Sequence, residues 1–304
     1  MILSAPSYYG KFKCIADKCR HSCCIGWEIG IDANTLNKYK CEQYTLKEEV
    51  LSSIDRSDDE NCFVMKDDGR CPFLDESGLC RIISECGENY LSDICRLHPR
   101  YFNYFEDHAE IGLGMVCEEA ARLILSEDDP FTAIPISEIS ACDNALSLEF
   151  VLAQRGKIFD ILKKDICLSK KLEHIEALCA VRSNIYSFDE WKSVFSELEI
   201  LDNEWRDMVS LSEEHPCLAD DEKYFERFIT YLVYRHIPRS ESEENLRAVM
   251  GFILISYEMV KNIYYSKNDR SLERLCDIMR LYSSEIEYCE DNVASLIFEF
   301  ESVL

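Results

Sequence analysis

The stretch Cys14-Ile-Ala-Asp-Lys-Cys19-Arg-His-Ser-Cys23-Cys24 gathers four thiols in a short segment near the start of the chain. A second run follows at wider spacing, at Cys71, Cys80, Cys95 and Cys117. The residues before Cys14 hold no apolar run long enough for an export signal, so we expect reduced thiols. Thiolates gathered this closely are then typical of metal binding rather than of disulfides. The count of 17 cysteines is odd, which also speaks against a fully paired disulfide framework.

Composition and charge limit the function classes. With 304 residues, of which 47% are hydrophobic, the chain can form one large domain or two ordinary ones. The net charge of −25 is spread along the sequence, whereas nucleic-acid binding needs clustered Lys and Arg, so we expect no nucleic-acid partner. The longest apolar stretch, residues 249–257, is half the length of a membrane span. We therefore expect no membrane partner and a cytoplasmic location.

The two halves of the chain differ in composition. Glycine, proline and eleven of the 17 cysteines are frequent up to about residue 117 and become sparse later. Residues 126–135 are polar and contain two prolines, which is typical of a boundary. The sequence predicts a Cys-rich metal- or iron–sulfur-binding region over residues 1–125, a linker over 126–140 and an all-helical domain over 141–304.

The second half shows helical periodicity. Apolar residues recur at helical spacing in three sets: Leu148, Leu152, Phe159 and Leu162; Phe225, Phe228, Ile229 and Leu232; Phe252, Ile255, Met259 and Ile263. Capping boxes at Ser187–Glu190, Ser240–Glu243 and Ser284–Glu287 predict helix starts. We expect six or seven amphipathic helices.

The first half predicts mixed structure. Alternation at Trp27, Ile29 and Ile31 favours a short strand, and residues 61–65 before an Asp-Gly turn favour one arm of a hairpin. Residues 84–97 and 115–125 are expected to be helical. The predicted fold class is mainly α, with a Cys-rich metal-binding N-terminal region that contains a short β-hairpin, followed by a helical bundle.

The cysteine spacing leaves the metal open. The sequence lacks the Cys-x2-Cys pairs of zinc ribbons, ferredoxin spacing and the Cys-x3-Cys-x2-Cys triplet of radical enzymes. Four thiolates suffice for zinc or for an iron–sulfur cluster. Adjacent Cys23 and Cys24 have diverging side chains, so they serve different metals, or one binds and one packs. The candidate ligands are Cys14, Cys19, Cys23, Cys24, Cys71, Cys80, Cys95 and Cys117, whereas Cys41, Cys62 and Cys86 are expected to be single buried thiols.

A longer ordered pattern runs through the same region. It consists of Pro6-Ser-Tyr-Tyr-x-Lys-Phe-x-Cys14, Cys19, Cys23-Cys24-x-Gly26-Trp27-x-Ile29-x-Ile31-Asp32-x-x-Thr35-x-x-x-Tyr39, Gly69-Arg70-Cys71-Pro72-Phe73-Leu74, Gly78-Leu79-Cys80, Gly87-Glu88, Leu91, Cys95, Pro99-Arg100, Glu110 and Cys117-x-Glu119-Ala120-Ala121-Arg122. This pattern resembles the N-terminal signature of flagellin lysine N-methylases. A broader kinship exists with small proteins that carry a zinc- or iron-chelating Cys-rich domain. The resemblance covers roughly the first 125 residues closely. Two positions depart from the family pattern, because no proline follows Cys117 and Cys86 stands in place of a leucine.

The resemblance implies an enzyme that methylates lysine ε-amines of flagellin. It also implies S-adenosylmethionine as the methyl donor and an iron–sulfur cluster, of the 4Fe-4S type or with zinc as the alternative, at or near the site. The usual glycine-rich methyltransferase motif is missing from the sequence. Two alternatives stay open: a non-catalytic zinc- or iron-binding structural module, and a redox sensor that uses the spare thiols.

Individual site candidates each have a structural alternative. Trp27 and Arg100 are candidates for cofactor binding, but Trp27 also suits the core, and Arg100 suits an ion pair with Glu110. The catalytic candidates are Tyr8, Tyr9, Asp32 and Arg100, although Asp32 before Thr35 is also typical of a helix cap. Tyr39 joins the tyrosines as a candidate wall of a lysine channel. His21 suits a hydrogen bond to a ligand sulfur better than metal ligation.

Overall fold

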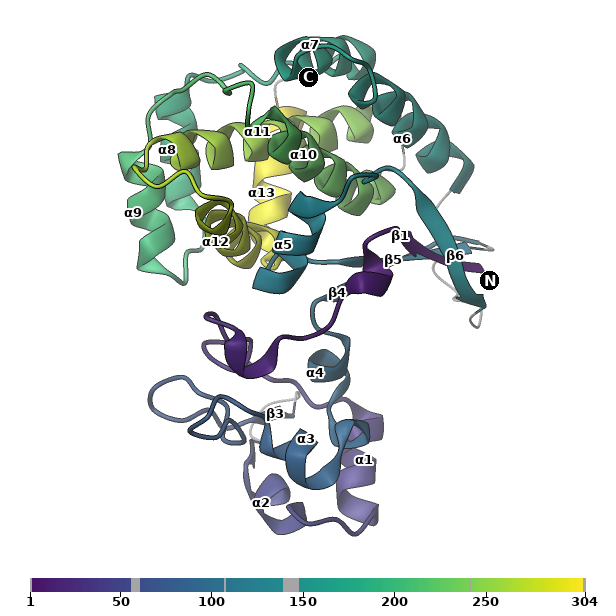
Figure 1. The fold of residues 1–304 in the computed structure, drawn as a ribbon, viewed down its shortest axis with the longest axis vertical. Helices are drawn as coiled ribbons and strands as arrows, with labels where there is room; N and C mark the ends of the chain where they lie inside the picture. The colour runs from purple at the N-terminus through teal and green to yellow at the C-terminus, as the bar shows by residue number, and fades with distance from the viewer. Residues whose placement is uncertain (1, 56–60, 107, 139–147, 241, 303–304) are drawn as a thin grey trace. The chain divides into compact units, whose positions relative to one another are not determined.

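The chain is mainly helical and divides into two compact units (Figure 1). The computed structural model describes residues 2–55, 61–106, 108–138, 148–240 and 242–302. We call Met1–Phe12 together with Phe102–Leu304 the helical unit, and Lys13–Tyr101 the cysteine-rich unit. The predicted mainly-α class with a Cys-rich N-terminal region is confirmed.

The two packing units have other bounds than the predicted domains. Residues 102–125, which the sequence assigns to the Cys-rich region, pack within the helical unit. Residues 139–147, which hold the end of the predicted linker and the start of the predicted helical domain, lie outside the described residues. The division at residues 126–140 stays a prediction.

Helix α11 (Glu243–Tyr265) forms the centre of the helical unit and is buried on nearly all sides. It contacts α10 (Glu222–His236), α12 (Leu272–Tyr282) and α13 (Glu290–Glu301). A helix that is apolar all round must be enclosed in this way. Gly251 permits the close approach of α13, because a Cβ at this position would lie 2.3 Å from the ring of Phe300.

The remaining helices of this unit are α5 (Glu118–Ser126), α6 (Leu148–Leu162), α7 (Leu168–Cys179), α8 (Phe188–Glu197) and α9 (Asn203–Leu211). The three periodic stretches fall in α6, α10 and α11, as predicted. Beyond the predicted linker, the described residues contain eight α-helices, slightly more than expected.

The three predicted capping boxes have different outcomes. Ser187 and Glu190 form the box that starts α8. The prediction at Ser240 is wrong, because Ser242 caps α11, whereas Ser240 follows a 3-10 turn, Ile237–Arg239. The prediction at residues 284–287 is also wrong: Ser283–Glu287 is a π-helical turn, and α13 begins later, at Glu290.

A buried polar network explains the π-helical turn. The Glu287 carboxylate accepts hydrogen bonds from Tyr231 Oη (2.8 Å) and His236 Nε2 (2.9 Å), and Arg235 Nε lies 3.4 Å away. Burial opposes ionisation, but the Arg235 charge and the His236 hydrogen bond outweigh it and lower the pKa of Glu287 to about 2. Burial lowers the pKa of His236 to about 4, despite Glu287. Glu287 therefore serves tertiary packing instead of capping the next helix.

A four-stranded sheet adjoins the helices in the strand order β4-β5-β1-β6. Strand β1 (Ile2–Pro6) pairs in parallel with β5 (His108–Leu113) and antiparallel with β6 (Ala133–Glu138), and β4 (Arg100–Tyr104) lies at the other edge. The sequence predicted none of these strands. Strand β6 lies within the predicted linker, where Pro135 is tolerated because β6 is an edge strand.

The cysteine-rich unit is built from short elements. Its helices are α1 (Ala33–Cys41), α2 (Lys47–Ser52), α3 (Arg81–Cys86) and α4 (Asp93–Leu97). The helix predicted over residues 84–97 is interrupted at Gly87, whose φ of +95° lies in a region that favours glycine. Buried Tyr39, Val50 and Phe73 belong to the apolar core of this unit.

The predicted strands of this unit are only partly present. Strand β3 (Cys62–Phe63) pairs with the preceding β2 (Ile54–Asp55) and not with residues after the Asp-Gly turn, so the predicted hairpin partner is wrong. The turn itself forms, with Gly69 at a φ of +74° and its amide donating to Lys66. Around Trp27, isolated bridges at Ile25 and Gly30 replace the predicted strand.

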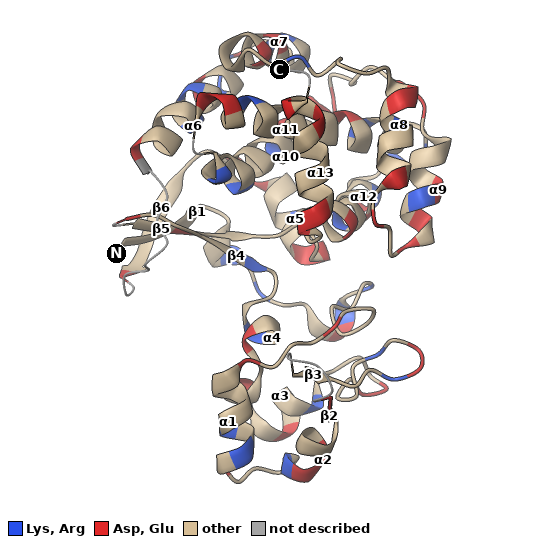
Figure 2. Cartoon of the chain, turned by 180° about the vertical axis from the view of Figure 1, so that it is seen from behind, with Lys and Arg blue, Asp and Glu red and all other residues tan. Residues whose placement is uncertain are grey.

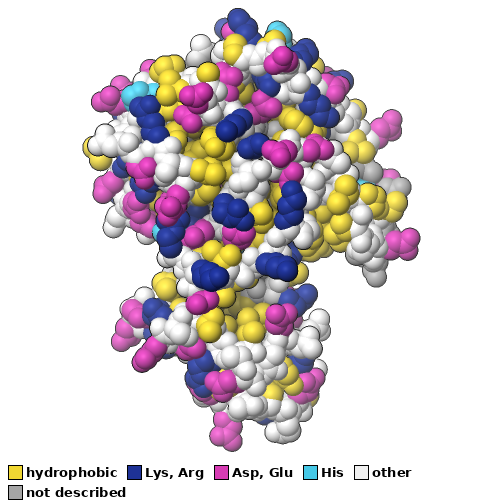
Figure 3. All heavy atoms as spheres, viewed as in Figure 1, with side chains coloured by type: hydrophobic (Ala, Val, Ile, Leu, Met, Phe, Trp, Pro, Cys, Tyr) yellow, Lys and Arg dark blue, Asp and Glu magenta, His cyan; other side chains and the backbone are white. Residues whose placement is uncertain are grey.

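Acidic residues are distributed over the helices of both units (Figure 2). On the face shown in Figure 3, Lys and Arg side chains are interspersed among them. The negative charge is therefore general to the surface, as the sequence indicated. Among the described helices, none is sufficiently long and apolar to cross a membrane.

Candidate metal centre

Five thiols lie in or against the core of the cysteine-rich unit. Cys86 is one of them, and the other four also act on one another electrostatically: Cys24, Cys71, Cys80 and Cys95. Cys71 is buried, and the other three are half-buried against the same apolar cluster. Their charges interact: Cys24, Cys80 and Cys95 each act on Cys71, and Cys24 and Cys80 act on Cys95. Four of the eight predicted ligands thus come together from segments up to 71 residues apart in sequence.

Backbone contacts hold the first two thiols in place. The Cys71 amide donates to the Cys24 carbonyl at 2.8 Å, which fixes the two segments side by side. The chain then returns to Cys80 through a turn in which Asp75 Oδ1 accepts from the amides of Ser77 and Leu79, both at 2.9 Å. These short-range bonds stabilise the turn within the Cys71–Cys80 loop.

Helix α4 presents the fourth thiol, Cys95. The amide of Asp93 donates to Asp32 Oδ2 at 3.0 Å, which ties the start of α4 to the N-cap of α1. Asp32 also caps α1 by accepting from the Thr35 amide at 2.9 Å, so the predicted cap is confirmed. A second bond joins α1 to the segment before α4, because the Tyr39 hydroxyl donates to the Tyr90 carbonyl at 2.6 Å.

The electrostatics of these thiols favour a cationic partner. Burial raises the pKa of Cys71 to about 12 and that of Cys95 to about 11, and neighbouring thiols add to the effect. Burial also raises the pKa of Cys80, whereas a hydrogen bond with Cys23 lowers the pKa of Cys24 to about 7. A coordinating metal deprotonates thiols and compensates such buried charge.

The donor set agrees with a soft metal. Four sulfurs in an apolar core are typical of a structural zinc site or of an iron–sulfur cluster. Within the residues that the structure describes, no three Cys, His, Asp or Glu side chains surround one point closely enough to hold a metal ion. The chemistry of the thiols and their common location in the core therefore suit a metal. The ligand set itself stays a prediction.

The other four predicted ligands occupy different settings. Cys14 is exposed and accepts from the Ala16 amide (3.4 Å) at the start of a 3-10 turn, Ala16–Lys18. The Cys19 thiol donates to the His21 carbonyl at 3.3 Å. Cys23 is exposed beside Cys24, and Cys117 is the N-cap residue of α5 in the helical unit. Among the sixteen described cysteines the structure contains no disulfide.

Comparison with known proteins finds a distant relative. The lysine-N-methylase of Salmonella typhimurium is 26% identical over 182 residues, which cover 55% of this chain and 41% of that enzyme. The chain is a distant homologue of this lysine-N-methylase. The matched part of the relative is less than half of its length. No protein-family model and no solved structure matches the chain significantly.

The remaining predicted site residues of the chain are placed as follows. Trp27 is half-buried in the cysteine-rich unit. Arg100 Nη1 donates to the His98 carbonyl at 3.5 Å. The expected partner of Arg100, the buried Glu110, is instead held by both Nη atoms of Arg155, at 2.8 and 2.5 Å. The ion pair that forms was not predicted, because no sequence pattern links the two positions.

The tyrosine candidates belong to different units. Tyr8 and Tyr9 lie in the helical unit, where Tyr9 begins the 3-10 turn Tyr9–Lys11. Tyr8 is buried, and burial together with the charge of Glu127 raises its pKa. Tyr39 is the candidate that lies in the same apolar core as the gathered thiols. Burial and the charges of Cys95 and Tyr44 raise its pKa. Of the three, Tyr39 is the one placed to influence a metal in the cysteine-rich unit.

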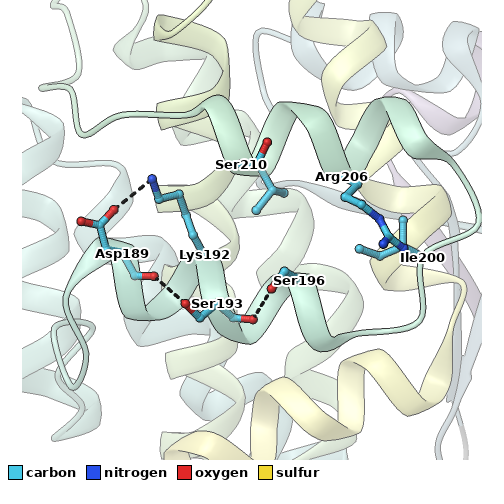
Figure 4. Close-up of a pocket in the computed structure, with 8 residues that line it drawn as sticks. Asp189, Lys192, Ser193, Ser196, Ile200, Arg206 and Ser210 are labelled. Carbon is cyan, nitrogen blue, oxygen red and sulfur yellow. Dashed lines mark hydrogen bonds and ion pairs between the residues drawn. The ribbon is translucent and has the colours of Figure 1, made fainter.

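A surface crevice of about 230 Å³ lies between α8 and α9 (Figure 4). Its lysine, Lys192, is paired with Asp189 at 2.9 Å. The hydroxyls of Ser193 and Ser196 donate to carbonyls of their own helix, as the dashed lines in Figure 4 show. Lys192, Ser193 and Ser196 are therefore bonded to groups of their own helix.

Proposed function

We propose that this chain transfers methyl groups from S-adenosylmethionine to lysine ε-amines of flagellin, as a cytoplasmic enzyme. The distant homology to a lysine-N-methylase carries this proposal. The gathering of Cys24, Cys71, Cys80 and Cys95 supports it, because the sequence resemblance implies a cluster-binding N-terminal region.

The reaction sets two requirements for the site. A lysine ammonium, with a pKa near 10.4 in water, must lose a proton before its nitrogen can attack. The sulfonium methyl must then be aligned with that nitrogen, so positioning can supply much of the rate enhancement. The hydrogen bonds of Asp32 and Asp75 hold the segments around the thiols in place, which supports positioning as part of the proposal.

In this proposal, three of the four gathered thiols would hold an iron–sulfur cluster, which leaves one iron short of a cysteine ligand. When bound, that iron would supply a site for the amino and carboxylate groups of the methyl donor. The protein residues keep the donors in place: Cys23 favours the Cys24 thiolate through its hydrogen bond, and the apolar core around Cys71 and Phe73 excludes water.

The test combines metal analysis with a methylation assay. The full chain is purified without oxygen, its iron, sulfide and zinc are measured, and flagellin is incubated with it and S-adenosylmethionine. We expect iron and sulfide in the protein and methyl mass increments on flagellin lysines. Cys71→Ser should lose both the metal and the activity. Cys179→Ser, which alters a buried thiol of α7, is the matched control and should retain them.

Three outcomes would count against the proposal. Full activity of metal-free folded protein would remove the cluster from the mechanism. Zinc without turnover would favour the non-catalytic module, and reversible metal loss under peroxide without turnover would favour the sensor.

A further inference from the structure

Hydrogen-bond donors lie beside the sulfurs of the gathered thiols. The amide of Phe73 acts on Cys71, and the amides of Ile82 and Ile83 act on Cys80, against the larger effect of burial. Such donors favour the thiolate, which is the form of cysteine that binds a metal. These donors belong to the backbone, so an ordinary side-chain substitution leaves them in place.

The donor beside Cys95 is instead a side chain, the hydroxyl of Ser92. Burial raises the pKa of Cys95 to about 11, and hydrogen bonding by Ser92 opposes this rise. Ser92 is the N-cap residue of α4, and Cys95 follows three positions later. At this spacing a side chain can reach back toward the N-cap residue. Ser92 and Cys95 therefore meet across the first turn of α4.

The Ser92 hydroxyl is not used in the way that is usual for an N-cap serine. The side chain is 1% exposed, and it makes no capping hydrogen bond to α4. Its Oγ has no well-aligned hydrogen-bond partner among the groups that the structure describes, so the contact with the neutral Cys95 thiol leaves it unsatisfied. A thiol sulfur is a weak acceptor, whereas an ionised acceptor forms much stronger hydrogen bonds. The buried hydroxyl thus lacks the partner that a thiolate would provide.

We propose that Ser92 is a positioning residue of the metal centre, whose hydroxyl donates a hydrogen bond to the metal-bound thiolate of Cys95. This inference rests on the metal site of the proposed function and names Cys95 as one of its ligands. Metal binding supplies the acceptor that Ser92 lacks, and Ser92 in turn stabilises negative charge on the sulfur. Because a reduced iron–sulfur cluster carries more negative charge than the oxidised one, this bond raises the reduction potential.

The test compares the metal-loaded full chain with its Ser92→Ala and Ser92→Thr variants, all purified without oxygen. Ser92→Ala removes the hydroxyl and should weaken metal retention against a chelator about tenfold, as is typical for the partners of metal ligands. It should also shift the ratio of reduced to oxidised cluster at a fixed potential about fivefold toward the oxidised form. Ser92→Thr keeps the hydroxyl and should restore both values. If Ser92→Ala retains no metal at all, recovery of the metal in Ser92→Thr supports the inference and its absence overturns it.

The matched control is Ser84→Ala in α3 of the same unit. The exposed Ser84 hydroxyl donates to the Arg81 carbonyl at 3.4 Å, so this variant should behave like wild type. A serine that only fills space in the core would alter the thermal stability and leave the reduction potential unchanged. An unchanged potential in Ser92→Ala therefore overturns the inference.

Zinc in place of iron calls for a second spectroscopic readout, on cobalt-substituted protein. Loss of the hydrogen bond raises the energy of the sulfur lone pairs, so Ser92→Ala should shift the sulfur-to-cobalt charge-transfer absorption to longer wavelength. An unshifted absorption overturns the inference, and so does a wild-type chain that binds no metal. Methyl transfer to flagellin is assayed separately. If the variants differ as expected and the wild type transfers no methyl group, the proposed function fails and the assignment of Ser92 stands.

Discussion

The two units of this chain are stabilised in different ways. The helical unit has a 23-residue central helix, α11, enclosed by other helices, and a core that contains two tryptophans. The longest helix of the cysteine-rich unit has nine residues, and its core includes thiols. Small units bury too little apolar surface for high stability and often depend on a metal. We infer that packing stabilises the helical unit and, on the proposed function, that a bound metal stabilises the cysteine-rich unit.

We expect the largest difference between the two units when a thiol is removed. Cys71→Ser should abolish exchange protection throughout the cysteine-rich unit and leave α11 protected, because structural zinc contributes about 10–16 kcal/mol in small metal domains. Hydrogen exchange resolved by residue is the measurement. The control is Cys179→Ser, and equal protection of the cysteine-rich unit in wild type and Cys71→Ser would contradict the comparison.

Acid should act on the helical unit through its buried network. His236 has a folded pKa of about 4, below its ordinary value of about 6.5, so the unfolded state binds its proton first. Stability is therefore full above pH 6.5 and falls by roughly 3 kcal/mol as the pH drops to 4. Below pH 4, protonation of Glu287, whose pKa is about 2, lowers the stability further. The buried Nδ1 of His236 has no hydrogen-bond partner among the described groups, which agrees with a neutral ring.

Urea unfolding followed through exchange of α10 amides, at pH values from 7 to 4, measures this effect. His236→Gln should flatten the profile between pH 6.5 and 4. A wild-type profile without slope in this range would contradict the assignment of a neutral buried histidine.

A tight helix contact gives a smaller effect. Gly251→Ala would place a methyl group against the ring of Phe300, and such overpacking costs about 1–3 kcal/mol. Thermal unfolding should show a lower Tm, with the metal content unchanged. Adding Phe300→Ala makes room for the methyl group, so Gly251→Ala should cost less in that background than in the wild type. Equal costs in the two backgrounds would show that the contact is not responsible.

The capping box of α8 should give the smallest change. Ser187→Ala removes the acceptor for the Glu190 amide and should lower the free energy of unfolding by about 1 kcal/mol. Ser193→Ala is the control, because its hydroxyl bonds to a carbonyl of its own helix and lies exposed. Equal stability of the two variants, measured by urea denaturation, would show that the capping box does not stabilise α8.

Local patterns predicted the helical unit better than the sheet and the thiol site. The periodicity at residues 225–232 and 252–263 identified α10 and α11, because an amphipathic or apolar helix is encoded within a few turns. The box at Ser187 was correct and the similar pattern at Ser284 was not, since Glu287 there binds distant His236. The strands were missed because β1 pairs with segments more than a hundred residues away.

The sequence indicated metal binding but not which thiols come together. Cys24 and Cys71 meet through a backbone bond between remote segments, and Cys95 is set by a bond between Asp32 and Asp93. The spacing of the cysteines in the sequence does not predict these contacts. Cys19 and Cys24 look equivalent in sequence, and the fold separates them by placing Cys24 against the apolar core.

The pairing of β1 with β5 and β6 has a consequence for synthesis on the ribosome. Residues 2–6 emerge well before residues 108–113 and 133–138, with the entire cysteine-rich unit between them. At about 5–20 residues per second this interval is on the order of ten seconds. On the proposed function, the cysteine-rich unit can therefore bind its metal before β1 meets β5 and β6.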